Sequence, residues 1–129
     1  MLFETKAALG AHAAIHRSLP ATSRGSRGPW AQLLAQILRL GEGHGQFFAH
    51  TERPWASATF SGSRHTIALE FTGPEAAEAG ERLIAALPDH EFDIPGHLVA
   101  DACAAEVRHA LLPEEVLKIT LEVLLLEDL

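Results

Sequence analysis

The sequence is poor in cysteine: Cys103 is the one cysteine among 129 residues. A single thiol excludes a disulfide within the chain and a cysteine-rich zinc cage. It favours a reducing compartment, so we predict a cytoplasmic location. Cys103 sits in an alternating segment with apolar neighbours, which indicates a small buried hydrophobic residue with a raised pKa.

Long apolar runs are also missing. No stretch of about 18 apolar residues occurs, so we expect no membrane span, and the N-terminus lacks the compact apolar region of a secretory signal. Basic side chains are scarce after the first 28 residues, since residues 1–28 carry a net charge of +3 and residues 29–129 a net charge of −10. An acidic body repels phosphate backbones, which disfavours nucleic acid as the main partner.

Residues 1–28 differ from the rest of the chain. Pro20 and the run Ser23–Gly28 interrupt regular structure, so we predict a flexible basic N-terminal tail. A targeting peptide and a basic docking arm are the alternative interpretations of this segment. The remaining residues, 29–129, have the length of one α+β domain that can bury a core of its own.

The segment 116–126 gives the clearest structural signal. Apolar residues occupy every second position, namely Leu117, Ile119, Leu121, Val123 and Leu125. Lys118, Thr120 and Glu122 fall between them, which predicts a half-buried strand. Beyond Val123 the alternation stops. Leu124 and Leu126 are expected to project from the solvent-exposed face of the strand, the face that carries Lys118 and Glu122. An exposed apolar patch at these two leucines would be a contact surface.

The other elements follow from turn and periodicity signals. We predict helices over 29–40 and from Pro74 to Pro88, and strands over 55–61, 65–72 and 98–109. The turn of the first hairpin is placed at Ser61–Arg64, and Gly80 indicates a close approach of helix and sheet. The order α-β-β-α-β-β predicts an α+β two-layer sandwich, in which two helices cover one face of a four-stranded antiparallel sheet.

Eight histidines raise the question of a metal site. His12 and His16 have i, i+4 spacing but lie in the tail and lack the glutamate of the zinc-protease motif. His90 to Asp93, with His97, offers suitable donor types in a loop that is expected to be solvated. We therefore predict no metal site and no cofactor.

Catalytic serine chemistry is not predicted either. Ser61 and Ser63 flank a glycine without the leading glycine of a nucleophile elbow, which indicates turn serines. No catalytic residue is identified on these grounds.

The richest cluster of polar residues is formed by His50, Glu52, Arg53 and Trp55, with His65 facing it across the hairpin. A base, a carboxylate, a cation and an aromatic ring could line a pocket for a small ligand. The alternative is that Arg53 stacks on Trp55 or pairs with Glu52 at the surface, which contributes under about 1 kcal/mol.

Two hypotheses on function follow from these patterns. The first is a non-enzymatic domain that self-associates as a homodimer, or binds a protein partner, through Leu124 and Leu126. The second is a small-ligand-binding protein or enzyme that uses the cluster at residues 50–65. Nucleic-acid binding through the basic tail is a third and weaker interpretation.

Overall fold

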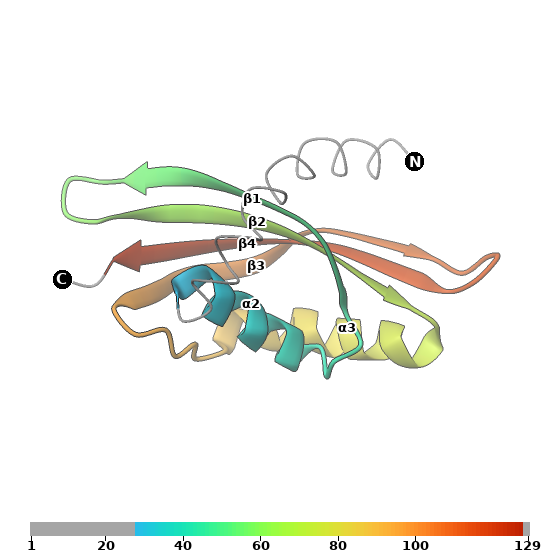
Figure 1. Cartoon of the computed structure of the whole chain (residues 1–129). Helices are drawn as coiled ribbons and strands as arrows, with labels where there is room; N and C mark the ends of the chain where they lie inside the picture. The colour runs from blue at the N-terminus through green and yellow to red at the C-terminus, as the bar shows by residue number, and fades with distance from the viewer. Residues whose placement is uncertain (1–27, 128–129) are drawn as a thin grey trace.

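The computed structural model describes residues 28–127 (Figure 1). In chain order the elements are α2 (Pro29–Leu40), β1 (Gln46–Ala56), β2 (Ser61–Thr72), α3 (Pro74–Ala86), the 3-10 turn η1 (Leu87–Asp89), β3 (His97–Ala110) and β4 (Val116–Glu127). This order confirms the predicted α+β fold, and both helices cover one face of the sheet (Figure 1). Residues 1–27 of the predicted tail lie outside the described part of the chain.

The sheet is antiparallel throughout, with the strand order β1-β2-β4-β3. β4 is therefore an inner strand, and β1 and β3 are the edges of the described sheet. The alternation predicted for β4 is confirmed. Five of its residues are buried in the core under the helices, namely Leu117, Ile119, Leu121, Val123 and Leu125. Within residues 28–127, no helix has both the length and the hydropathy needed to cross a membrane.

Helix α2 begins where the sequence predicts. Pro29 occupies the first turn, where its missing N–H costs nothing. Gly28 is the N-cap and offers no side chain to the first turn. Leu33 and Ile37, one turn apart, are fully buried against the sheet. The start of this helix thereby comes to lie over one end of the sheet.

Helix α3 packs closely on the sheet. Its buried face consists of small residues and one leucine: Ala76, Ala77, Ala79, Gly80 and Leu83. A Cβ atom on Gly80 would lie 2.7 Å from Leu117 Cδ2 and 3.0 Å from Phe71 Cδ1. The close approach predicted for Gly80 is confirmed, since any side chain at this position would overlap the core.

The predicted position of the first hairpin is wrong by several residues. β1 ends at Ala56 and the turn lies at 57–60, where Ser57 N donates to Phe60 O at 2.8 Å. Pro54 lies within β1, opposite Ser63. β1 is an edge strand, and an edge tolerates a residue that cannot donate to the ladder. Ser61 and Ser63 consequently lie in β2 and are not turn serines.

Cys103 does not point into the core. Two bulges in β3, at Val99/Asp101 and Ala104/Glu106, change which residues face the helices. Cys103 pairs with Glu122 on the opposite face and is half-buried. The raised pKa of its thiol is confirmed: burial is the main cause, and the negative charges of Asp101 and Glu122 add to it.

Candidate functional site

The polar residues of the first hairpin meet on the face of the sheet that carries the helices. Glu52 is directly opposite His65, and His50 is opposite Ile67, a core residue. Since alternate residues of a strand share a face, His50 and Glu52 on β1 lie beside Ser63 and His65 on β2. Four polar side chains are thus gathered by strand register alone.

A bulge in β1 determines the direction of His50. Phe47 is opposite Leu69 and His50 is opposite Ile67, with one extra residue, Phe48, between them. In a regular strand, residues three apart point to opposite faces. The bulge allows both Phe47 and His50 to face the helices, while Phe48 is 53% exposed.

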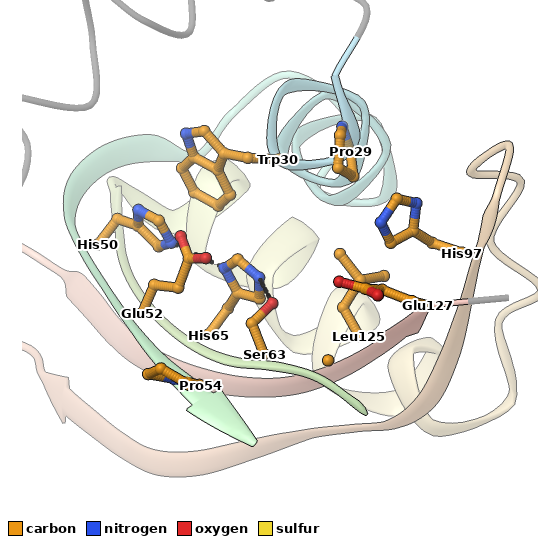
Figure 2. A pocket seen from close by; sticks show the side chains of 11 residues that line it. Pro29, Trp30, His50, Glu52, Pro54, Ser63, His65, His97, Leu125 and Glu127 are labelled. Carbon is orange, nitrogen blue, oxygen red and sulfur yellow. Dashed lines mark hydrogen bonds between the residues drawn. The ribbon is translucent and has the colours of Figure 1, made fainter. Parts of the chain in front are cut away.

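These side chains line a cavity of about 650 Å³ (Figure 2). The start of α2 forms one wall. The beginning of β3, at His97, and the end of β4, at Glu127, form another. The lining residues are Pro29, Trp30, His50, Glu52, Pro54, Gly62, Ser63, His65, His97, Leu125 and Glu127. A concave space of this volume is typical of small-molecule sites.

His50 and His65 are in direct contact at the inner end of the cavity. Nε2 of His50 lies 2.9 Å from Nδ1 of His65, and Nε2 of His65 lies 2.8 Å from Oγ of Ser63 (Figure 2). The two rings are 3% and 2% exposed. In the contact between them, one nitrogen donates its hydrogen and the other accepts it. Nδ1 of His50 is buried and has no hydrogen-bond partner among residues 28–127.

Trp30 covers the two imidazoles. Its indole is stacked on His50 with ring centroids 3.6 Å apart and an interplanar angle of 9°. Burial, followed by the neighbouring His65, lowers the pKa of His50 to about 4. Burial also lowers the pKa of His65, and the charge of Glu52 opposes this effect. Both rings are therefore neutral at pH 7, and each has one unprotonated nitrogen.

The mouth of the cavity is acidic. Glu52 and Glu127 are both exposed and line it, and none of the residues that line it is Lys or Arg. His97 contributes a third imidazole, whose Nδ1 donates to the carbonyl of Pro95 at 3.3 Å. The lining offers acceptors and negative charge, which suits cationic or uncharged ligands better than anionic ones.

The structure brings together three of the five residues that were predicted to form a ligand pocket. His50, Glu52 and His65 line the cavity. Arg53 and Trp55 do not, because they alternate with Glu52 along β1 and pair with Arg64 and Gly62 on the other face. Neither the arginine nor the tryptophan of the predicted cluster belongs to this cavity.

Sequence reasoning missed the other eight lining residues, four of which carry a polar or an aromatic side chain: Trp30, Ser63, His97 and Glu127. Trp30 lies in the first turn of α2 and belongs to the apolar face of that helix, which by itself indicates core packing and not a cavity wall. Ser63 carried a usable signal, because it precedes His65 by two positions and so shares its face. His97 and Glu127 pair across β3 and β4, a long-range register that no local pattern indicates.

The expected exposed patch at the end of β4 is wrong. Leu124 and Leu126 are 8% and 6% exposed. β4 lies between two paired strands, with Arg64 of β2 and Asp101 of β3 flanking Leu124. Side chains of an inner strand have neighbours on both sides, whereas the prediction treated the strand in isolation.

Comparison with protein-family models, with curated proteins and with solved structures found no match for this chain. Function is therefore inferred from the cavity itself.

Proposed function

We propose that this protein binds a small molecule in the cavity formed by His50, Glu52 and His65, as a ligand-binding protein or an enzyme. The observation that carries the proposal is the pair of hydrogen-bonded imidazoles at its inner end, 2.9 Å apart and almost fully buried. Burying polar groups costs free energy that apolar side chains would not cost. Titratable groups with displaced pKa values that line a cavity are typical of functional sites.

The chemistry of the lining favours a cationic or an uncharged polar ligand. Glu52 and Glu127 attract positive charge at the mouth, and no Lys or Arg of the lining is there to bind an anion. Deeper in the cavity, the neutral imidazoles and the hydroxyl of Ser63 offer hydrogen bonds. His65 also contacts Oγ of Ser63 at 2.8 Å, so an imidazole and a hydroxyl, two groups that serve in acid–base chemistry, lie side by side in the lining.

Tryptophan fluorescence provides the test. The chain has two tryptophans, Trp30 in the cavity wall and Trp55 on the opposite face of the sheet. The variant Trp55→Phe leaves Trp30 as the sole reporter, and a panel of small ammonium compounds, neutral amides, polyols, carboxylates and phosphates supplies the probes. We expect saturable changes in Trp30 emission with cationic or neutral members, and none with the anions.

Two variants control this experiment. Trp30→Phe leaves only Trp55 and is expected not to respond to any compound. Glu52→Gln is expected to weaken the binding of a cationic ligand by about 1.5–3 kcal/mol, which is the range for a hydrogen bond to a charged group. The proposal is contradicted by a panel without effect on Trp30, or by equal responses from the two single-tryptophan variants.

Self-association, a protein partner and the cytoplasmic location stay predictions. Both edges of β4 are already paired, so an added strand could reach this sheet at β1 or β3. Sedimentation analysis over a range of concentrations tests the homodimer, and a strict monomer would contradict it.

A further inference from the structure

We infer that the cavity holds a divalent first-row transition metal ion, such as Zn²⁺, through His50, Glu52 and His65. The inference rests on the proposed function, because the ion would be the cavity's contact with the small molecule. It departs from the prediction of no metal site made from the sequence. That prediction considered histidine spacing on helices and in loops, whereas these ligands are brought together by two paired strands.

The three side chains converge on one point. Each offers a ligand atom, and these atoms all lie within 4.8 Å of one another. Figure 2 shows the Glu52 carboxylate beside the contact between the two rings. Two nitrogens bound to a tetrahedral zinc ion at 2.0–2.1 Å would lie about 3.3 Å apart, so the 2.9 Å contact needs to widen by about 0.4 Å. Small side-chain rotations supply a displacement of this size.

The hydrogen bond at the far nitrogen of His65 also suits a metal ion. Metal binding requires neutral imidazoles and an ionised carboxylate. When Nδ1 of His65 binds an ion, its hydrogen resides on Nε2, which then donates to Oγ of Ser63 at 2.8 Å. Such a partner on the remote nitrogen is what orients metal-bound histidines in general. The ion would replace the hydrogen that the two rings share.

Burial separates this cluster from the other polar groups of the chain. Across residues 28–127, His50 and His65 are the buried polar or charged residues of the structure. An ion bound through Nε2 of His50 would leave the hydrogen of that ring on Nδ1, which is buried and has no protein partner within residues 28–127, so a water molecule is its expected partner.

The ligand set indicates which ions fit. Two imidazoles and a carboxylate suit zinc, iron and their neighbours, whereas calcium and magnesium prefer oxygen ligands throughout. Three protein ligands leave at least one coordination position open, as in catalytic zinc sites. The open position faces the cavity, where a small molecule would complete the coordination.

Calorimetric titration of the full chain with Zn²⁺, after treatment with a chelator, tests the inference. We expect one ion per chain and binding that releases protons. Because removal of a buried imidazole can unfold the chain, the deciding variant is Glu52→Gln, at an exposed position. We expect it to lower Zn²⁺ affinity by more than about 100-fold, since even orienting partners of metal ligands contribute 10–100-fold.

Control variants address the other possible sites. Glu127→Gln changes the second carboxylate of the same cavity and is expected to have a much smaller effect. The double variant His12→Ala/His16→Ala removes the i, i+4 pair outside the described residues and is expected to leave affinity unchanged. His65→Gln, with folding verified by circular dichroism, is expected to abolish stoichiometric binding and the visible absorption of bound Co²⁺.

The results separate the metal inference from the proposed function. Absence of stoichiometric binding, equal Zn²⁺ affinity in Glu52→Gln, or loss of binding in the His12/His16 variant would overturn the metal site. Trp30 emission is then measured with the compound panel on chelator-treated protein. If Trp30 emission responds to the compounds and Zn²⁺ does not bind, only the metal inference is contradicted. If Trp30 emission does not respond and Zn²⁺ does not bind, the small-molecule cavity is contradicted as well.

Discussion

Glu52 lies directly opposite His65 across the antiparallel pair β1–β2, and both side chains face the helices. His50 precedes Glu52 by two positions, so the same face receives a second imidazole at contact distance from the first. Strand pairing therefore positions the candidate ligands, and no flexible loop is involved. A slip of one residue in this register would turn the side chains of one strand to the other face.

The hydroxyl of Ser63 is expected to orient His65. In Ser63→Ala, Nε2 of His65 loses its partner, and we predict a 10- to 100-fold decrease in Zn²⁺ affinity, the range for partners of metal-bound histidines. The measurement is calorimetric titration with Zn²⁺. Ser61→Ala is the matched control on the same strand, and its hydroxyl is not part of the cavity lining. Equal affinities in both variants would show that Ser63 has no orienting role.

Trp30 is expected to stabilise the fold as well as to cover His50. Trp30→Ala removes a stacked contact at 3.6 Å and should lower the free energy of unfolding by about 2 kcal/mol, less than the 3–5 kcal/mol typical of fully buried tryptophan because this side chain is only half-buried. Urea denaturation provides the value. Trp30→Phe retains an aromatic ring and should recover most of the loss. If the free energy of unfolding of Trp30→Ala differs from that of the wild type by less than about 0.5 kcal/mol, this role is contradicted.

The parts of the fold that follow from local patterns were predictable from the sequence. The alternation from Leu117 to Val123 identified β4, and Pro29 with the apolar stripe after it identified α2. Periodicity suffices in these stretches because each of them buries one face more deeply than the other. The same local signals placed Gly80 at a close contact with the sheet.

What the sequence did not reveal depends on long-range geometry. The placement of β4 between β2 and β3 buries Leu124, and nothing within β4 indicates its neighbours. The bulge in β1 and the two bulges in β3 change which residues share a face, so simple alternation misplaced Cys103. Of the cavity, His50, Glu52 and His65 were found because they are close in sequence or face one another across the predicted hairpin, whereas His97 enters only through tertiary pairing.

Packing at Gly80 gives a direct test of the interface between α3 and the sheet. Alanine normally stabilises a helix by about 1 kcal/mol relative to glycine. In Gly80→Ala, however, the new Cβ would meet Leu117 at 2.7 Å and Phe71 at 3.0 Å, so we predict a net destabilisation of about 1–2 kcal/mol from overpacking. Ala85→Gly, at an exposed position of the same helix, measures the difference in helix propensity between alanine and glycine without a change in core packing. An increase in the midpoint of urea unfolding for Gly80→Ala would contradict the close packing.

Cys103 gives a prediction on pH dependence. Its pKa is raised, first by burial and then by the charges of Asp101 and Glu122, so less thiolate is present at pH 7.5 than in an unperturbed cysteine. Iodoacetamide should therefore react more slowly than with a model thiol, and the rate should still rise above pH 9. Since the chain has one cysteine, mass spectrometry reports this residue alone.

Asp101→Asn separates the effect of charge from that of burial at Cys103. Removal of this negative charge should increase the alkylation rate at pH 7.5 by about two- to threefold, in line with surface charge pairs worth under about 1 kcal/mol. Glu115→Gln, a distant acidic position, is the control. A rate equal to that of a free model thiol at every pH would contradict the raised pKa.

The most direct test of the account is anomalous X-ray diffraction at the zinc edge from crystals of the full chain grown with Zn²⁺. The account predicts an anomalous peak between Nε2 of His50, Nδ1 of His65 and the carboxylate of Glu52, on the side of the rings that faces the cavity. Ordered rings in their present hydrogen bond, with zinc peaks confined to exposed histidines such as His44 or His109, would contradict it.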